Sequence, residues 1–397
     1  MNQRQFSSRR APVPLAEPDL SGREAEYLME CVRTNFVSSV GPFVTRFEEA
    51  VAASCDAGAA VAVSSGTAGL HLALVCVGVG AGDLVIAPSF TFIASANAIA
   101  HCGASPWLFD IEHASWTLDL ALLEDRLRTQ TARQGDALVH RASGRRVAAL
   151  MPVYTLGTPA DMEKLNGIAR QYRLPVVADA AAALGATYKR QQLAPLADLT
   201  VFSFNGNKTV TSGGGGAIVG TDRSLLARAR HLCAQARVGA EYVHDAVGYN
   251  YRMTNLEAAV GLAQMERCAE LVARKQAVRA TYDRAFSDLP GVSCFPQPQW
   301  CASACWLSGL SLAAEAPVSP DELRAALDEQ GIAAGIFWRP VHLQEPYREC
   351  PRTQQQVGES IAPTIVILPC STSLSEDVQA RVIDTVREHL LRPRRAA

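Results

Sequence analysis

An acid and an amine each follow an apolar run of the sequence, and together they indicate a specific chemistry. Asp179 comes directly after the run at 175–178, and Lys208 follows the run at 199–204. Because the carboxyl ends of parallel strands form the ligand crevice of an α/β sheet, we expect both side chains at one edge. A lysine that holds an aldehyde as an imine and a carboxylate that keeps a pyridine nitrogen protonated are what pyridoxal 5′-phosphate requires. An ordinary buried ion pair between Asp179 and Lys208 is the structural alternative.

A cofactor of this kind also needs a phosphate cradle and an apolar wall. The segment SSGT at 64–67 lies between an apolar run and a helical pattern, so its free backbone N–H groups favour a phosphate. Ser203 could add a hydroxyl, and Phe92 could form the wall. The same residue types also serve as ordinary helix caps and core aromatics. The glycine-rich segments at 78–83 and 213–216 match neither a P-loop nor the dinucleotide-binding spacing.

Seven short apolar runs, separated in several places by helical patterns, are the elements expected to position these residues. They are AAVAVS (59–64), LVIAP (84–88), SPWLFD (105–110), VAALMPV (147–153), PVVADA (175–180), LTVFSF (199–204) and GAIVG (216–220). Strands connected through crossover helices produce this alternation. Several runs are apolar at consecutive positions, as strands covered on both faces are. We therefore predict an α/β fold with a mostly parallel, seven-stranded sheet.

The pattern changes in the last third of the chain. Helical patterns cover 67–78, 161–173, 255–286, 319–330 and 375–391. After the turn signal Leu-Pro-Gly at 289–291, short strands and helices suggest a smaller α/β unit. We expect a large domain at 12–262 and a small C-terminal domain at 263–397, with one long helix at about 255–286 bridging them.

Composition narrows the possible partners and the location of the protein. The 397 residues include 37 basic and 39 acidic side chains, so a net charge of −2 provides no general attraction for nucleic acid or a membrane surface. The N-terminal residues lack the apolar core of a secretory signal, which favours a cytoplasmic protein. The 11 cysteines contain no C-x-x-C pair, and we predict no metal site. A metal or redox site that uses Cys301 and Cys305 is the alternative.

The assembled motifs resemble the nucleotide-sugar aminotransferases of the DegT/StrS type, over nearly the whole chain. The resemblance is carried by NFVSSVGPFVTRFE (35–48), SSGTAGLHLAL (64–74), APSFTFIASANAI (87–99), TVFSFNGNKTVTSGGGG (200–216), GYNYRMTNLEAAVGLAQ (248–264) and WRPVHLQ (338–344). It implies the fold-type I architecture of pyridoxal-phosphate enzymes, with a three-layer αβα large domain and a smaller C-terminal α/β domain. Among the branches, the chain is most similar to enzymes that aminate C4 of UDP-linked 4-keto-6-deoxy-N-acetylhexosamines, which serve the synthesis of bacterial surface glycans.

The resemblance also implies roles for individual residues. Lys208 would form the Schiff base and move protons, and Asp179 would bind the pyridine nitrogen. Phe92 would stack on the ring, while Gly66, Thr67 and Ser203 would hold the phosphate. Asn250 or Arg252 would reach into the site of a partner subunit, which implies a homodimer with shared active sites. His342 and the 36–43 loop, with Phe36 and Ser39, would contact the sugar or the nucleotide. The alternatives for Arg252 and His342 are purely structural roles.

Three residues depart from the pattern of the family. Ala178 stands where glutamate is usual before Asp179, and Ala182 replaces a polar residue expected near the phenolic oxygen of the cofactor. Tyr154 stands where the related branch usually has histidine. Tyr154 is therefore a candidate substrate contact, and Tyr154 or water is a candidate for the missing hydrogen bond.

The expected reaction moves an amino group from L-glutamate to a keto-sugar in two half-reactions. One alternative is a dehydratase of the same fold that removes a hydroxyl from the sugar, although in such enzymes histidine replaces the lysine. A second alternative is a catalytically silent relative that acts as a regulatory or scaffold subunit, suggested by Ala178 and Ala182. Retention of both Asp179 and Lys208 favours an enzyme, because a buried ion pair is costly to keep without a use.

Overall fold

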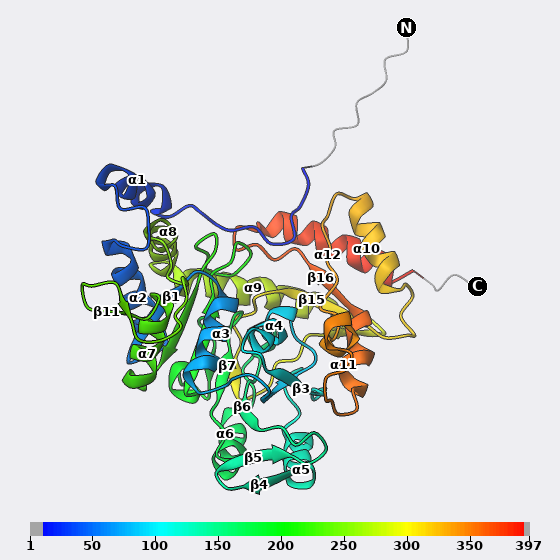
Figure 1. Cartoon of the computed structure of the whole chain (residues 1–397). Helices are drawn as coiled ribbons and strands as arrows, with labels where there is room; N and C mark the ends of the chain where they lie inside the picture. Colours follow the sequence, from blue (N-terminus) through cyan, green and yellow to red (C-terminus); the bar gives the residue numbers. More distant parts are fainter. Residues whose placement is uncertain (1–10, 393–397) are drawn as a thin grey trace.

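The computed structural model describes residues 11–392, and a seven-stranded sheet forms the centre of this part of the chain (Figure 1). The strands lie in the order β1 (Ala59–Val63), β10 (Gly216–Gly220), β9 (Leu199–Ser203), β7 (Val177–Asp179), β6 (Val147–Leu150), β2 (Leu84–Pro88) and β3 (Ser105–Phe109). Isolated bridges join β6 to β7, from Leu150 to Val176 and from Val153 to Asp179. The predicted sheet is confirmed.

Only one strand of this sheet, within the described residues, runs against its neighbours. β10 pairs antiparallel with both β1 and β9, whereas the pairs β7 with β9, β2 with β3 and β2 with β6 are parallel. The reason is the connection between β9 and β10. The segment 204–215 turns back directly instead of crossing over through a helix, and it carries Lys208.

Helices cover both faces of the sheet because successive side chains of each strand point to opposite faces. Val61 and Val63 of β1 pack in one apolar cluster, and Ala60 and Ala62 pack in another. The first face is covered by α3 (Gly66–Cys76), α4 (Ile93–His101) and α7 (Arg223–Cys233). The second is covered by α1 (Glu24–Thr34), α2 (Pro42–Ser54), α5 (Leu120–Gln130), α6 (Met162–Tyr172) and α8 (Asn255–Met265). The expected three-layer αβα arrangement is confirmed.

The C-terminal part has its own sheet and apolar core. Its three antiparallel strands are β13 (Val292–Cys294), β15 (Ser308–Leu312) and β16 (Ile365–Leu368). They pack with α9 (Cys268–Phe286), α10 (Pro320–Glu329) and α12 (Glu376–Leu390). Val13 joins this core and pairs with Ile332, so the described N-terminal segment contacts the C-terminal unit. The domain limits at 262 and 263 stay a prediction.

The prediction of one continuous helix at 255–286 is wrong, because the structure divides this segment into α8 and α9. The break lies at Glu266 and Arg267, where the Arg267 N–H bonds to the carbonyl of Gln264. The Arg267 guanidinium also binds Asp19 at 3.1 Å and Glu270 at 2.8 Å. α8 packs in the core of the large unit. α9 is shared between the two cores: Cys268, Leu271 and Val272 pack with the large unit, and Val278, Tyr282 and Phe286 pack in the C-terminal core. Both halves consist of helix-forming residues, so their composition does not reveal the break.

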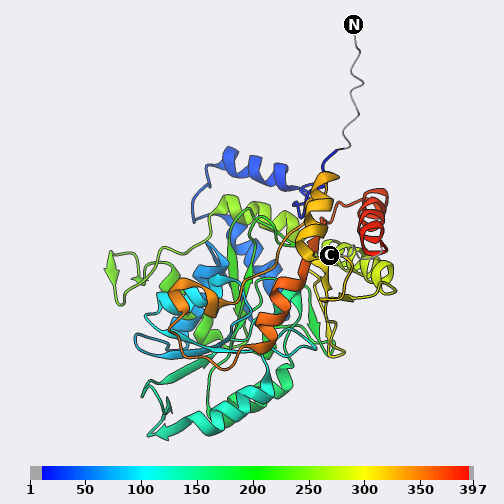
Figure 2. The ribbon, with the colours of Figure 1, turned by 90° about the vertical axis from the view of Figure 1, so that its right-hand side faces the viewer.

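Shorter elements lie at the periphery. They are β4 (Thr131–Gln134), β5 (Ala137–His140), β8 (Thr187–Tyr188), β11 (Arg237–Val238), β12 (Val243–His244), β14 (Cys301–Ala302), α11 (Gln356–Ile361) and the 3-10 turns η1 (Thr155–Gly157), η2 (Ala194–Leu196), η3 (Val341–Leu343), η4 (Glu345–Tyr347) and η5 (Ala362–Thr364). The β11–β12 hairpin projects from the body of the molecule (Figures 1 and 2). None of the helices within residues 11–392 combines the length and the apolar character needed to cross a membrane.

Candidate active site

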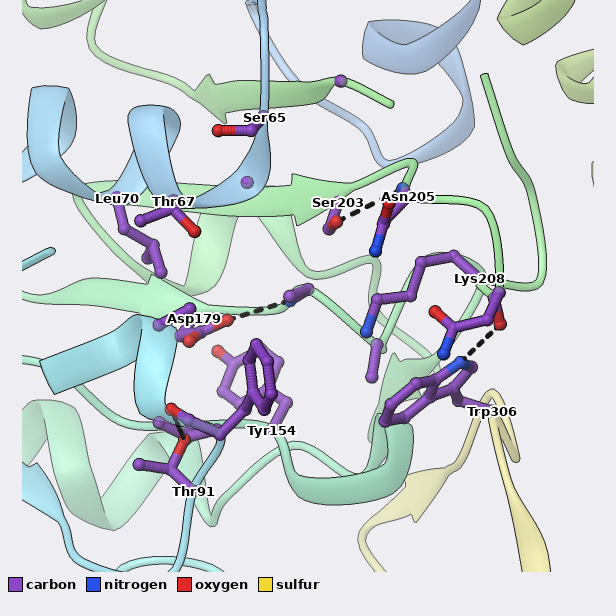
Figure 3. A pocket seen from close by; sticks show the side chains of 18 of the residues that line it. Ser65, Thr67, Leu70, Thr91, Tyr154, Asp179, Ser203, Asn205, Lys208 and Trp306 are labelled. Carbon is purple, nitrogen blue, oxygen red and sulfur yellow. Dashed lines mark hydrogen bonds between the residues drawn. The ribbon is translucent and has the colours of Figure 1, made fainter. Parts of the chain in front are cut away.

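A cavity opens beyond the carboxyl ends of β7 and β9, at the edge of the sheet expected from the sequence. Figure 3 shows side chains from both faces of the sheet and from the C-terminal unit converging on it. It is lined by Ser64, Ser65, Gly66, Thr67, Leu70, Thr91, Phe92, Ala94, Val153, Tyr154, Asp179, Ala181, Ala182, Ser203, Asn205, Asn207, Lys208, Gly214, Gly215, Trp306 and Trp338.

Asp179 is a carboxylate held in place from two sides. Ser95 donates a 2.6 Å hydrogen bond to Oδ2, and the Ala181 N–H donates one of 3.1 Å to Oδ1. The side chain is buried, at 5% exposure. Burial raises the pKa of Asp179, while the hydrogen bonds from Ser95 and Ala181 and the charge of Lys208 act against the rise. The carboxylate is thus positioned before any ligand arrives.

Lys208 extends into the same cavity from the 204–215 segment. Its Nζ lies 3.5 Å from the centre of the Trp306 ring, within the range of a cation–π contact. The surrounding protein lowers the pKa of the amine to about 8, chiefly through burial, with a smaller contribution from the charge of Lys275, although Asp179 favours the charged form. An amine with such a pKa is partly uncharged near neutral pH and can act as a nucleophile or base.

Trp306 and Lys275 support the Lys208 side of the cavity. The Trp306 indole N–H donates a 2.8 Å hydrogen bond to the carbonyl of Asn207. Lys275, a buried residue of α9, donates to the carbonyls of Trp306 at 3.0 Å and Cys370 at 2.6 Å. The C-terminal unit therefore contributes a ring to the cavity and fixes it through hydrogen bonds.

The amino end of α3 forms an anion cradle on the other side. Ser65 caps the helix, and its Oγ accepts a 3.0 Å hydrogen bond from the Ala68 N–H. Gly66 and Thr67 begin the helix, where backbone N–H groups lack partners within the helix and favour an anion. A Cβ at Gly66 would lie 2.9 Å from the Cβ of Ser203, so the close approach of these two segments requires glycine.

The residues of the cavity fit pyridoxal 5′-phosphate. They supply an amine for the aldehyde, a carboxylate for the pyridine nitrogen and a helix end for the phosphate. Tyr154 adds a hydroxyl that is buried without a hydrogen-bond partner in the described structure, so the cavity holds an unused polar atom for a ligand. Lys208 would hold the cofactor covalently, Asp179 would keep the ring nitrogen protonated, and Gly66, Thr67 and Ser203 would bind the phosphate.

The structure gathers seven of the predicted site residues and places five elsewhere. Those around the cavity are Gly66, Thr67, Phe92, Tyr154, Asp179, Ser203 and Lys208. Phe92 lies beside Trp338, with 6.2 Å between ring centres, and is half exposed. Ser39, Asn250 and Arg252 line a separate surface hollow, and Phe36 is exposed. Their contribution to a site stays a prediction.

His342 is also absent from the cavity lining, and its environment shows why. Its Nδ1 shares a 2.6 Å hydrogen bond with the Ser89 hydroxyl, and its Nε2 lies 2.9 Å from Glu359 Oε1. The residue is buried, and burial lowers the pKa of its imidazole. With both nitrogens engaged, His342 connects the segments of Ser89 and Glu359, and its contact with the sugar or the nucleotide stays a prediction.

Sequence reasoning missed three side chains of the site. Trp306 and Trp338 come from the C-terminal part. Trp338 begins the segment WRPVHLQ (338–344), which carries part of the family resemblance, but nothing in the sequence neighbourhood of Trp306 relates it to Lys208. Ser95 carried a weak signal, because Thr91 and Ser95 are a polar pair spaced by one helical turn, and their hydroxyls lie 2.8 Å apart. Cys301 and Cys305 are free thiols, and burial raises the pKa of Cys301 to about 12.

Fold and cavity together define a pyridoxal-phosphate-dependent transferase of fold type I. The chain belongs to the DegT/DnrJ/EryC1/StrS aminotransferase family, whose model matches residues 18–387. The predicted aminotransferase class and cofactor are thereby confirmed, as is the expectation of a nucleotide-sugar aminotransferase at the level of the family.

Comparisons with individual proteins agree with this assignment. The chain is 36% identical over 381 residues to a GDP-perosamine synthase of Caulobacter vibrioides, a match that covers 96% of this chain and 98% of the relative. It is 33% identical over 377 residues to a GDP-perosamine synthase of Escherichia coli O157:H7, covering 95% and 98%. The solved structure of S. venezuelae DesV in complex with a ketimine intermediate superposes with a TM-score of 0.86 at 31% identity, covering 96% of this chain and 100% of DesV.

Proposed function

We propose that this protein transfers an amino group from L-glutamate to the C4 keto group of a nucleotide-linked 4-keto-6-deoxy sugar, for the synthesis of a bacterial surface glycan. The observation that carries the proposal is the pair of Asp179 and Lys208, which face one cavity from the ends of neighbouring strands. Membership of an aminotransferase family supports the nitrogen-transfer reaction over removal of a hydroxyl.

The residues of the cavity would have different roles in such a reaction. When bound, pyridoxal phosphate supplies an aldehyde that exchanges for an amine and a ring that accepts electrons from the adjacent carbon. Asp179 keeps the ring nitrogen protonated, which strengthens that withdrawal. Lys208 Nζ then takes the proton from the amino-bearing carbon of glutamate and returns one to the former keto carbon of the sugar. Trp306 excludes water beside this amine.

The nucleotide is the finer part of the proposal. The relatives named GDP-perosamine synthase carry GDP in the names of their products, so we propose a GDP-linked sugar as the first substrate to test. The UDP-linked N-acetylhexosamine expected from the sequence resemblance is the second. Tyr154 and Ala182 are departures that line the cavity and therefore affect which sugar fits.

The assay that tests the proposal combines L-glutamate with sugars linked to either of the two nucleotides. Purified protein with pyridoxal phosphate and L-glutamate is given GDP-linked or UDP-linked 4-keto-6-deoxy sugar, and 2-oxoglutarate and the product mass are measured. We expect stoichiometric 2-oxoglutarate and a product in which an amine replaces the keto oxygen. A deoxygenated sugar formed without glutamate consumption would establish the dehydratase alternative. Protein that remains colourless with added cofactor would establish the silent relative.

We further propose a homodimer with shared sites. The β11–β12 hairpin, the residues that follow it and the 36–40 loop expose large apolar side chains, among them Phe36, Val40, Tyr242 at 86% and Val247 at 85%. Exposed apolar groups gathered in this way are typical of protein interfaces. Asn250 and Arg252 line a hollow beside these segments, apart from the cavity of their own chain. A second copy of the chain would cover the apolar groups and receive Asn250 or Arg252.

Hybrid dimers test the shared site. Lys208→Ala inactivates the cavity of its own chain, and Arg252→Ala would inactivate the cavity of the partner. Mixing the two inactive variants after dissociation and reassociation should restore activity, because one hybrid site contains neither substitution. Mixtures that stay inactive, although light scattering shows dimers, would contradict the shared site.

A further inference from the structure

The hydroxyl of Tyr154 is a polar group that nothing in the described structure satisfies. The side chain is 1% exposed, and Oη is buried without a hydrogen-bond partner among the described residues. A buried hydroxyl without a hydrogen-bond partner destabilises the folded protein, which suggests that a ligand supplies the partner. Tyr154 and Asp179 both line the cavity, and both are labelled in Figure 3. Burial raises the pKa of Tyr154, which keeps the hydroxyl protonated and able to donate.

The backbone holds Tyr154 at a fixed place next to Asp179. Tyr154 directly follows Val153, which bridges to Asp179, and the Tyr154 N–H donates a 2.9 Å hydrogen bond to the Asp179 carbonyl. The 3-10 turn η1 begins at the next residue. In the strand order β9–β7–β6, Tyr154 thus lies on the side of β7 that faces β6, whereas the anion cradle lies on the side that faces β9.

This order of strands assigns the substituents of the pyridoxal ring. The ring nitrogen and the aldehyde carbon lie opposite each other, and they correspond to Asp179 and Lys208. The phosphate arm and the phenolic oxygen lie on opposite sides of the line that joins them. With the phosphate at Gly66 and Ser203, the phenolic oxygen must face the β6 side, where Tyr154 lies (Figure 3).

We propose that the Tyr154 hydroxyl donates a hydrogen bond to the phenolic oxygen of the bound cofactor, in place of the polar side chain that Ala182 lacks. The inference rests on the proposed function only in requiring that pyridoxal phosphate occupies this cavity. It makes Tyr154 a cofactor-binding residue, in contrast to the substrate contact expected from the sequence.

The hydrogen bond has a consequence for proton binding. With the cofactor bound through Lys208, its phenolic oxygen would share a proton with Nζ, and a second donor at that oxygen would weaken its hold on the proton. The charged groups around the pair are Asp179 on β7, Lys208 itself and Lys275 on α9, and Tyr154→Phe leaves all three in place. The variant should therefore release the proton from Nζ at higher pH than the wild type does.

The test is a pH titration of the visible absorption band of the holoenzyme without substrate. We expect Tyr154→Phe to raise the midpoint by about one pH unit. Because one hydrogen bond to the cofactor is lost, we also expect the Kd for pyridoxal phosphate to rise about tenfold. The apoprotein of the variant should be at least as thermally stable as the wild type, because the lost hydroxyl had no partner.

Tyr282→Phe is the matched control. Its buried hydroxyl donates a 2.8 Å hydrogen bond to the Pro369 carbonyl, outside the cavity. This control should lower the Tm and leave both cofactor readouts unchanged. If the wild type shows a normal band but Tyr154→Phe leaves both the midpoint and the Kd unchanged, the inference about Tyr154 is overturned and the proposed function stands. A change confined to the KM of the sugar would have the same consequence. A wild-type protein with no band would overturn the proposed function as well.

Discussion

The ring of Trp306 lies over the amine of Lys208, 3.5 Å from Nζ to the ring centre, while its indole N–H bonds to the carbonyl of Asn207, the residue before Lys208. One side chain of the C-terminal unit thus contacts both the reactive amine and the backbone that carries it. Burial is the main cause of the lowered pKa of Lys208, and the Trp306 ring covers the amine, so we expect this contact to contribute to the reactivity of the site.

Capture of the cofactor by the apoenzyme should accelerate with rising pH. Only the uncharged amine attacks an aldehyde, and the pKa of Lys208 is lowered to about 8, so the rate should rise through a midpoint near pH 8. Stopped-flow absorbance after mixing apoenzyme with pyridoxal phosphate measures this profile. A midpoint near the ordinary lysine value of 10.5 would mean that the amine is hydrated.

Removal of the Trp306 ring should move that midpoint upward. Trp306→Ala admits water beside Nζ, which stabilises the charged amine, so capture should require higher pH. Trp306→Phe retains an aromatic face and loses the bond to Asn207, and we expect a smaller shift. If both variants shift the midpoint equally, the hydrogen bond to Asn207, not exclusion of water, controls the amine.

Lys208→Ala should abolish the visible cofactor band and reduce kcat by at least about 10³, within the usual contribution of a general acid–base. Absorbance and the 2-oxoglutarate assay measure the two effects. Lys164→Ala, at an exposed position of α6, is the control and should behave as wild type. Retention of full turnover by Lys208→Ala would contradict the mechanism.

Ser95→Ala should weaken catalysis without preventing capture of the cofactor. The substitution removes a 2.6 Å hydrogen bond to Asp179, and such bonds to charged groups contribute about 1.5 to 3 kcal/mol. We expect kcat to fall roughly 10-fold to 100-fold, while Ser95→Thr retains part of the activity. Equal activity of Ser95→Ala and wild type would show that the Ala181 N–H alone holds the carboxylate.

Gly66→Ala should weaken phosphate binding. The new Cβ would lie 2.9 Å from the Ser203 side chain and would displace one wall of the cradle, so the Kd for pyridoxal phosphate should rise about tenfold or more. Gly167→Ala makes the same chemical change within α6, where no atom lies within 4 Å of the new Cβ. This control should leave the Kd unchanged and raise the stability by up to about 1 kcal/mol.

The sequence predicted the sheet and the acid–amine pair because both depend on strands. A strand buried on both faces is apolar at consecutive positions, and Asp179 and Lys208 follow such runs. The break at Arg267 could not be predicted, since helix-forming residues lie on both sides of it and the ion pair of Arg267 with Asp19 depends on tertiary structure. Trp306 reaches Lys208 only through the placement of the C-terminal unit. The engagement of His342 by Glu359 likewise depends on tertiary structure.

The turn between β9 and β10 limits how Lys208 can move. At its base the Phe204 N–H bonds to the Gly215 carbonyl at 3.0 Å, and the Ser212 N–H bonds to the Phe204 carbonyl at 2.9 Å. The Lys208 N–H bonds to Asn205, which closes the segment further. Since the main chain is secured in this way, in the proposed reaction Nζ would move between cofactor and sugar only by rotation of its flexible four-carbon stem. Each proton would therefore be delivered within the reach of that stem, and only a sugar carbon presented inside this small radius would become aminated.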